Sequence, residues 1–381
     1  MPVSPMQERA TVARIFVALD LSKNTWVIAV GSPISGKISQ YRIAGGDAQG
    51  LRHLIEELRR RAARATATEV GVSCCYEAGP DGFWLHRLLT DHGIDNHVID
   101  AASVHVSRRA RRAKTDRLDA ETLVRVLMAY HRGERKVCSM VRVPTIEAED
   151  IKRQHRERER LVAARTAHVA RIKGLASTQG VRDVKPLRAD WPAALQSLRT
   201  GDGHPIPSCL KAELLREWRR LQLVVEMIKA VEQERDQPPQ EEAHAANNEK
   251  RQLLKKLKGV GPSFATVLTR EVFYRRFANR REVGSYVGLA PTPFNSGAMR
   301  RDQGISKAGN PRARATAIEL AWLWLKHQPE STLSQWFRAR TGSLQGRIRK
   351  ITIVAVARKL IVALWRYLET GVVPTGAVIK A

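Results

Sequence analysis

The chain has 381 residues, with 65 Lys and Arg against 38 Asp and Glu, so its formal net charge is +27. Apolar residues make up 43% of it, which is enough for packed cores in two or three domains and excludes a wholly disordered basic tail. So large a positive charge attracts polyanions by its long-range field and by counterion release, and nucleic acid is the expected partner. The four cysteines follow neither a disulfide framework nor a zinc-binding spacing.

An anionic membrane surface is the competing partner for a basic chain, but it requires an anchor. The longest apolar stretch, Ile351 to Trp365, is interrupted by Arg358 and Lys359 and is too short to cross a bilayer. The N-terminus has no apolar segment followed by a cleavage site. We therefore expect no membrane partner and a soluble, cytoplasmic protein.

The first part of the chain alternates strand and helix signals. Three apolar segments separated by short turns predict an antiparallel meander, and two later strands are separated from it by helices, which indicates a mixed sheet with helices packed on it. The strands are expected at residues 14–19, 25–30, 38–43, 69–76 and 96–99, and the helices at 51–63 and 83–89.

The middle of the chain is predicted to be helical, over residues 145–178 and 211–231, with a Pro- and Gly-rich loop at 181–208. The second helix carries apolar residues at spacings of 4, 3, 4 and 3, which is the rhythm of a coiled coil. These residues are Leu214, Trp218, Leu221, Val225 and Ile228. Either the two helices form a coiled-coil arm that dimerises, or they belong to a plain bundle.

The last part, from about residue 248, reads as helical and strongly basic. A Gly- and Arg-rich loop is expected at residues 291–311, between a helical segment and two apolar helices at 313–325 and 348–368. The fold class is therefore α/β plus all-α. The predicted domains are 1–140 (mixed sheet), 141–247 (helical coiled-coil arm) and 248–381 (mainly helical).

Four acidic residues occupy positions that suit metal binding. Asp20 and Glu77 each close a predicted strand, while Asp116 and Asp119 are three residues apart at the start of a helix and can share one face. Carboxylates gathered in this way can hold a pair of Mg²⁺ ions, which clamp the attacking and leaving oxygens of a phosphodiester. Taken singly, each acid is more often a turn or helix-capping residue than a metal ligand. Glu121 is excluded because its spacing from Asp119 places it on another face.

Three motifs surround these acids: Phe16 to Lys23 (FVALDLSK), Tyr76 to Pro80 (YEAGP) and Lys114 to Ala120 (KTDRLDA). In this order they resemble the ribonuclease H-like (RuvC-like) nuclease fold. More closely, the chain resembles the DEDD transposases of insertion-sequence family one-hundred-and-ten, the Piv-like, bridge-RNA-guided recombinases. The resemblance implies that the four acids are the D, E, D and D of that family and bind Mg²⁺, with two ions expected.

A second group of motifs lies downstream. Gly259-Val260-Gly261-Pro262 resembles a helix-hairpin-helix, whose turn offers backbone N–H groups to a phosphate. The segments at 286–291, 295–297 and 304–310 resemble the C-terminal transposase domain of the same family, in which a serine beside a glycine is the nucleophile. The matching residue is Ser296, which from its neighbours alone reads as a loop serine. Ser285 and Ser306 are nearby alternatives.

Basic residues accompany both groups of motifs, and we expect them to contact phosphates. Near the Asp116 motif they are Arg108, Arg109, Arg111, Arg112 and Lys114, and around Ser296 they are Arg300, Arg301, Lys307, Arg312 and Arg314. By itself, a run of charges is usually a solvated surface.

The resemblance implies a DNA transposase or recombinase in which Ser296 attacks a phosphodiester and forms a covalent 5′-phosphoserine link. It also implies donor and target DNA and a guide (bridge) RNA as partners. The family's composite active site implies a homo-oligomer, a dimer or tetramer, in a bacterial or archaeal cytoplasm at the nucleoid. The alternatives are a Holliday-junction resolvase that uses the same acids with water as nucleophile, and a non-enzymatic nucleic-acid-binding scaffold.

Overall fold

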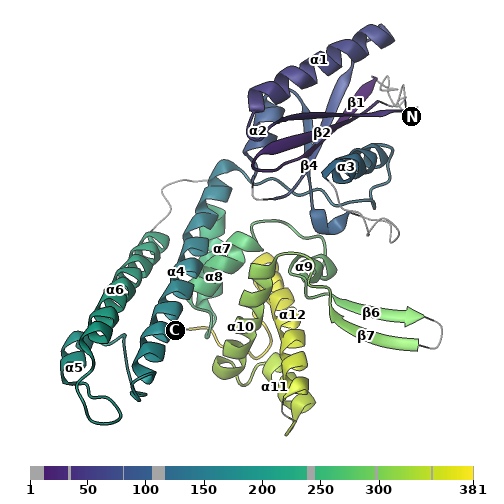
Figure 1. Cartoon of the computed structure of the whole chain (residues 1–381). Coiled ribbons are helices and arrows are strands. Elements are labelled where there is room, and N and C mark those ends of the chain that lie inside the picture. Colours follow the sequence, from purple (N-terminus) through teal and green to yellow (C-terminus); the bar gives the residue numbers. More distant parts are fainter. Residues whose placement is uncertain are drawn as a thin grey trace. The chain divides into compact units, whose positions relative to one another are not determined.

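The computed structural model describes residues 13–32, 36–79, 81–104, 116–237, 245–296, 299–344 and 346–380. The chain forms two compact units, Met1–Pro144 and Thr145–Ala381, each with its own core (Figure 1).

The first unit is built on a five-stranded mixed sheet with the strand order β3-β2-β1-β4-β5. Its strands are β1 (Arg14–Asp20), β2 (Thr25–Gly31), β3 (Ile38–Ala44), β4 (Gly71–Glu77) and β5 (Asp95–Ile99). The first three strands pair antiparallel, and β4 and β5 join β1 in parallel. The predicted meander and the two later strands are confirmed.

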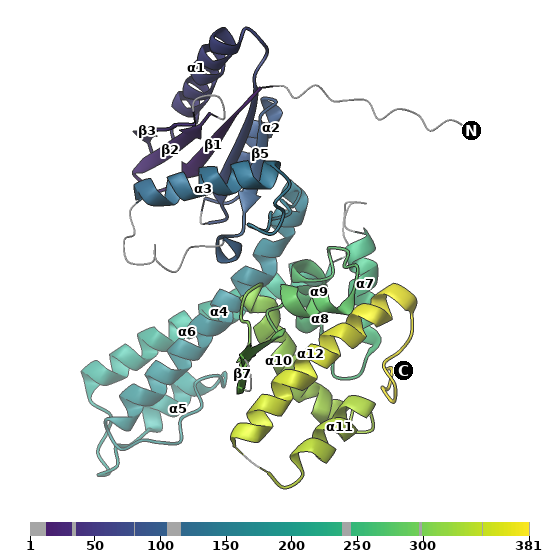
Figure 2. The ribbon, with the colours of Figure 1, turned by 90° about the vertical axis from the view of Figure 1, so that its right-hand side faces the viewer.

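Helices cover both faces of this sheet. The helices α1 (Ala48–Thr66) and α2 (Trp84–Asp91) pack on the face that carries Val17 and Leu19, whereas α3 (Asp116–His131) packs on the opposite face (Figure 2). Because side chains alternate along a strand, the buried central strands are apolar on both faces. A short 3₁₀ turn, Ala101–Ser103, follows β5.

The second unit begins with a helical hairpin of α4 (Ile146–Ser177) and α6 (Ser208–Asp236), which pack along each other (Figure 1). Leu214 and Leu221 of the predicted seam are fully buried here, in a cluster that includes Ile172 of α4. The segment expected to be a loop between the two helices contains a short helix, α5 (Trp191–Ser197). Trp191 and Leu195 of α5 are buried in the same cluster, so tertiary burial stabilises a helix that is too short to be stable alone.

The remaining helices surround a separate apolar core that contains Trp324 and Phe273. They are α7 (Ala245–Lys256), α8 (Pro262–Glu271), α9 (Arg280–Tyr286), α10 (Pro311–His327), α11 (Thr332–Thr341) and α12 (Arg347–Thr370). The two apolar helices expected near the C-terminus are confirmed as α10 and α12.

The expectation of a loop over residues 291–311 is wrong for most of that segment. It forms a two-stranded antiparallel hairpin of β6 (Pro291–Ser296) and β7 (Met299–Ile305). The prolines at 291 and 293 and the arginines hide any alternating pattern, and the register shifts between the two prolines. The strands exist through cross-strand main-chain pairing, which local composition does not reveal.

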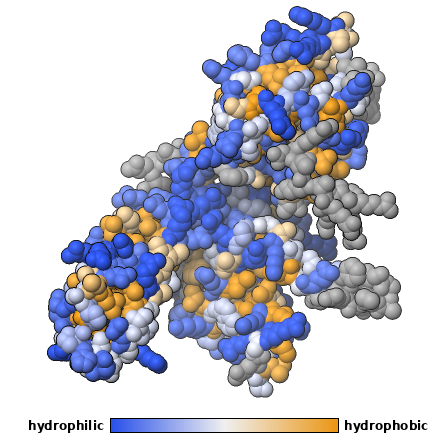
Figure 3. Space-filling view, viewed as in Figure 1, coloured by the Kyte–Doolittle hydropathy of each residue, from blue (hydrophilic) through white to orange (hydrophobic). Residues whose placement is uncertain are grey.

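The surface of the second unit is strongly polar along the exposed side of α4, where hydrophilic side chains gather, while apolar side chains appear over α10 and α12 (Figure 3). Trp322 of α10 and Ile351 of α12 are exposed apolar residues. Across the described ranges, no helix combines the length and the apolar character that crossing a bilayer would need.

Candidate active site

Two of the predicted acids lie side by side at one edge of the sheet. Parallel pairing of β1 with β4 sets Leu19 opposite Tyr76, so Asp20 and Glu77 follow at the carboxyl ends of neighbouring strands. Asp20 lies two residues after Ala18, and Glu77 lies two residues after Cys75. Ala18 and Cys75 are buried against α3. Because side chains alternate between the two faces of a strand, both carboxylates project from the face that α3 covers. The parallel pairing thus joins two acids that are 57 residues apart in the sequence.

The other two acids lie at the start of α3, which packs on that face. Asp116 is the first residue of the helix, although its side chain is outside the described set, and Asp119 is half-buried one turn further on. Ala120 packs against the sheet. Glu121 instead accepts a hydrogen bond of 3.0 Å from Gln40 on β3, which agrees with its exclusion from the acid set.

The donor set at this edge fits Mg²⁺. It consists of hard carboxylate oxygens from two strand ends and one helix, which is the type of ligand that Mg²⁺ prefers. The carboxylate oxygens of Asp20, Glu77 and Asp119 do not all lie within 4.8 Å of one another in this structure. Among the described residues, that criterion is met by a different cluster in the same unit, which is described below. Carboxylates that share an edge repel one another, and a divalent cation would draw them together. Asp100 follows β5 at the same edge, but the alternation along β5 directs it to the opposite face.

Ser296 is the last residue of β6 and pairs with Met299 of β7. Its side chain, like those of Arg300 and Arg301, lies outside the described set, so only the backbone places them. Arg300 is paired with Asn295, the residue before the serine, and Arg301 with Phe294. The hairpin therefore brings the predicted nucleophile and two predicted phosphate-binding arginines to the same end of a two-stranded ribbon.

The base of the β6–β7 hairpin contains two closely packed glycines, Gly288 and Gly309, from the motifs at 286–291 and 304–310. A Cβ on Gly288 would lie 2.3 Å from the Ala308 carbonyl oxygen, and a Cβ on Gly309 would lie 2.3 Å from the Tyr286 carbonyl oxygen. Lys307 adopts a left-handed backbone with φ of 56°, and its carbonyl accepts a hydrogen bond from Arg314. The motifs on the two sides of the hairpin thus form one tight junction, in which Arg314 has a structural contact.

The turn between α7 and α8 contains Gly259 and Gly261. Gly259 has φ of 88°, and a Cβ there would lie 2.9 Å from the Cβ of His327, so only glycine fits this turn. Gly261 is the N-cap of α8. The C-terminal segment pairs with the same turn, because the Lys258 amide donates to the Val378 carbonyl at 3.0 Å.

Glu271, at the end of α8, was not anticipated from the sequence. Its side chain is 3% exposed and accepts hydrogen bonds from His155 and Arg156 on α4 and from Asn310, the N-cap of α10. Arg312 approaches Glu271 at 3.6 Å and also pairs with Glu159 of α4. Arg312, predicted to contact phosphate, therefore has two carboxylate partners within its own unit. The adjacent charged residues Arg270 and Glu271, at the end of a helix whose other residues are uncharged, were the available signal.

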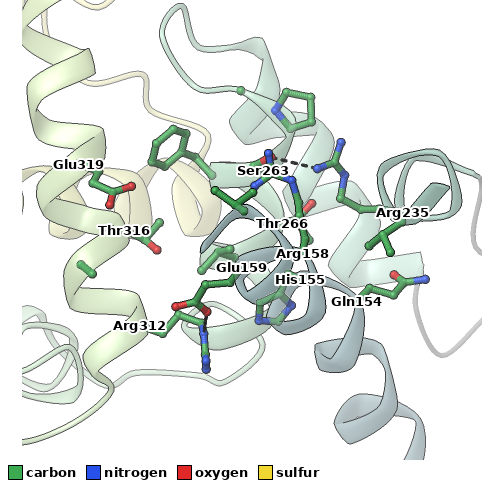
Figure 4. A pocket seen from close by; sticks show the side chains of 17 residues that line it. Gln154, His155, Arg158, Glu159, Arg235, Ser263, Thr266, Arg312, Thr316 and Glu319 are labelled. Atoms are coloured by element: carbon green, nitrogen blue, oxygen red, sulfur yellow. Dashed lines mark hydrogen bonds and ion pairs between the residues drawn. The ribbon is translucent and has the colours of Figure 1, made fainter. Parts of the chain in front are cut away.

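A pocket of about 420 Å³ lies among α4, α6, α8 and α10, beside the first residues of α8 (Figure 4). Arg158, Arg235 and Arg312 line it, and Arg235 donates to the Ser263 hydroxyl at 3.0 Å. Each of these arginines is also paired with a carboxylate: Glu232, Asp236 and Glu159 respectively. The pocket is therefore largely charge-compensated.

The basic residues that are predicted to contact phosphate in the first unit lie outside the described residues. They are Arg108, Arg109, Arg111, Arg112 and Lys114.

Comparisons with known proteins agree with the acid motifs and with the C-terminal motifs. A family model of DEDD transposases of the IS110 type, described as "Transposase", matches residues 17–178, and the model "Transposase IS116/IS110/IS902 family" matches residues 251–335. The chain is 51% identical to the putative transposase y4rJ of Sinorhizobium fredii over 100% of this chain and 98% of that protein. It is 26% identical to the transposase for insertion sequence element IS1111A of Coxiella burnetii, over 86% of each chain. Because motifs, fold and whole-length similarity agree, the chain belongs to the IS110 family of DEDD transposases.

Proposed function

We propose that this transposase cuts and rejoins DNA through a covalent phosphoserine intermediate, with Ser296 as the nucleophile and the four acids as the metal-binding group. The observation that carries this proposal is the pairing of β1 with β4, which sets Asp20 beside Glu77 on the face covered by α3. Asp116 and Asp119 begin that helix.

The acids would hold Mg²⁺, which when bound polarises the scissile phosphate and lowers the barrier to deprotonating the serine. Ser296 Oγ forms a bond to phosphorus, and the bond from phosphorus to the 3′ oxygen breaks. The serine proton leaves, and the 3′ oxygen takes up a proton and departs as a hydroxyl. The 5′ end remains attached to the protein until a 3′ hydroxyl reverses the step on a new strand.

The position of Ser296 supports this role. It ends β6 at the far end of the hairpin from the glycine junction, where a DNA backbone can approach it. Arg300 and Arg301 begin the return strand, and guanidinium groups can stabilise the charge that develops on the phosphoryl oxygens.

The turn from Gly259 to Gly261 is proposed to act as a helix-hairpin-helix that binds a DNA phosphate. Two helices, α7 and α8, flank this turn, and the first amides of α8 have no partner within the helix. Lys307, Arg314 and the basic run before Asp116 are proposed as further phosphate contacts. The α4–α6 hairpin is proposed to serve as a coiled-coil arm between subunits.

Two partners follow from the family resemblance. The acids belong to the first unit and Ser296 to the second, and a composite site formed by two subunits requires a homodimer or tetramer. The resemblance also implies a guide RNA, which is proposed to select donor and target DNA.

A covalent trap tests the proposal. The protein is expressed with its native flanking DNA, which includes any adjacent guide RNA, and the lysate is denatured and probed for DNA attached to the protein. Attachment in the wild type that is lost in Ser296→Ala, and retained in the matched control Ser306→Ala, is the expected result.

Strand cutting that continues unchanged in Ser296→Ala would overturn the serine mechanism and favour the resolvase alternative, in which water attacks. Cutting that continues in Asp20→Asn would overturn the role of the acids.

A further inference from the structure

A second cluster of potential ligands lies in the first unit, away from the acid edge. We propose that Asp95, His97 and His131 bind one divalent transition-metal ion, for which zinc is the best match. Among the described residues, this is the group of three whose ligand atoms all lie within 4.8 Å of one another. The inference does not depend on the proposed DNA chemistry.

The three side chains converge because α3 lies across the sheet. Asp95 and His97 are two residues apart on β5 and therefore project from the same face, which α3 covers. His131 is the last residue of α3, whose first turn carries Asp116 and Asp119. At a rise of 1.5 Å per residue, the helix separates this cluster from the acid edge by about 22 Å.

Distances within the cluster suit a shared cation. His97 Nε2 lies 3.1 Å from Asp95 Oδ1, and His131 Nε2 lies 3.8 Å from Asp95 Oδ2. Ligand atoms around a tetrahedral zinc ion are about 3–3.5 Å apart, as follows from bonds of about 2.0–2.1 Å. A small inward movement of His131 would complete such a set.

Each imidazole Nε2 lies within ion-pair distance of Asp95 but makes no well-aligned hydrogen bond to a described residue. Both Nε2 atoms are shielded from solvent, and neither has an aligned hydrogen-bond partner within the described part of the chain, even though Asp95 is close to both. A buried polar atom without a partner is costly, and a metal ion would satisfy both nitrogens at once. The side chains of His97 and His131 are each about one quarter exposed and that of Asp95 is 44% exposed, so the cluster lies near the protein surface.

The carboxylate has a supporting shell. Asp95 Oδ2 accepts hydrogen bonds from Arg14 at 2.8 Å and from the Ser73 hydroxyl at 2.9 Å, which leaves Oδ1 directed toward His97. Such outer contacts orient metal-binding carboxylates. Phe16 packs edge-on against His131 at 5.2 Å between ring centroids.

The composition of the cluster selects the metal. Two imidazoles and one carboxylate match zinc sites with three protein ligands and an open position for water. Mg²⁺ prefers oxygen ligands, so it does not suit this cluster with its two imidazoles. The four acids at the other edge, which offer only carboxylate oxygens, do suit Mg²⁺. Bound zinc would connect the end of α3 to β5 and stabilise the first unit by mass action.

The test is a zinc titration of the full-length, chelator-stripped protein, in a Cys209→Ser background because Cys209 is exposed. Millimolar Mg²⁺ is present throughout to occupy oxygen-rich sites. One zinc ion per chain is expected to bind and to raise the melting temperature. His97→Gln and His131→Gln should each weaken binding by about a hundredfold or more, because outer-shell changes alone cost 10–100-fold. His53→Gln, an exposed histidine on α1, is the matched control and should bind normally.

Cobalt replacement on the otherwise unchanged protein gives a readout that does not depend on how the variants fold. Visible absorption bands of a four- or five-coordinate Co²⁺ ion with nitrogen and oxygen ligands are expected, and zinc should displace them. Failure of both zinc and Co²⁺ to bind in the presence of Mg²⁺ would overturn the proposal, as would equal zinc affinity in the wild type and both histidine variants. The cluster would then be an ion-pair network centred on Asp95.

Discussion

Glu271 of α8 and His155 of α4 form a buried pair in which the carboxylate Oε1 lies 2.8 Å from the imidazole Nε2. Burial alone would raise the pKa of Glu271. The hydrogen bonds from His155 and Arg156 outweigh burial, so the pKa lies well below its usual range. The ionised carboxylate therefore connects the α4–α6 hairpin to the helices that carry the β6–β7 ribbon.

Glu271→Gln is expected to lower the free energy of unfolding of the second unit by about 3 kcal/mol. The substitution removes the buried negative charge that both His155 and Arg156 contact. Urea unfolding followed by tryptophan fluorescence measures this, since six of the eight tryptophans lie in that unit. Glu159→Gln is the control, because Glu159 pairs with Arg312 but is exposed, and it should cost no more than about 1 kcal/mol. Equal losses in the two variants would contradict the central role of Glu271.

Acid should weaken the α4–α6 hairpin through Glu217. Burial opposes ionisation of this residue, but hydrogen bonds from His168, Arg220 and Arg171 lower its pKa from 4.5 to about 2. Because the folded pKa is the lower one, the stabilisation is fully present above pH 4.5 and is lost as the pH falls toward 2. It amounts to something on the order of 3 kcal/mol at neutral pH.

This pH dependence is measured by comparing the unfolding free energies of the wild type and Glu217→Gln at neutral pH and near pH 2. The difference between the two proteins should be large at neutral pH and should shrink in acid. A difference that stays constant over this range would refute the assignment.

Gly309→Ala should disrupt the junction that holds the β6–β7 hairpin. Gly309 has φ of 103°, and an added Cβ would lie 2.3 Å from the Tyr286 carbonyl oxygen. Left-handed strain of about 1–2 kcal/mol and overpacking of about 1–3 kcal/mol both apply. Gly304→Ala has the strain alone, because a Cβ there meets nothing within 4 Å, so it separates the two effects.

The measurement for both glycine variants is the unfolding free energy together with DNA cleavage. Gly309→Ala should be the less stable and the less active of the two. If Gly309→Ala and Gly304→Ala lost the same amount of stability, the predicted clash with the Tyr286 carbonyl oxygen would be unimportant.

Asp20→Asn and Glu77→Gln should each reduce Mg²⁺-dependent DNA cleavage about a hundredfold or more, because each removes a charge from the shared edge of the sheet. Glu121→Gln is the matched control on α3, since Glu121 accepts from Gln40 and does not face the acid edge. The measurement is the rate of DNA cleavage by each variant at a saturating DNA concentration. A loss with Glu121→Gln as large as the loss with Asp20→Asn would argue against this division of roles.

Much of the chain's organisation was readable from local signals. The apolar strands, the amphipathic helices and the glycines at tight turns follow from the two-residue and 3.6-residue periods and from backbone sterics. The motifs around Asp20, Glu77 and Asp116 were sufficient to suggest a DEDD transposase, because they resemble the motifs of that family.

Contacts between distant segments were not readable. The β6–β7 hairpin forms by cross-strand pairing, and α5 forms because Trp191 and Leu195 are buried by other helices. The pair of Glu271 with His155 joins residues 116 apart, and the Asp95, His97 and His131 cluster exists because α3 ends above β5. The sequence by itself determined most of the elements, the acid motifs and the family. The tertiary structure decided which charged side chains meet, because such pairs depend on the packing of whole elements and leave no periodic signal along the chain.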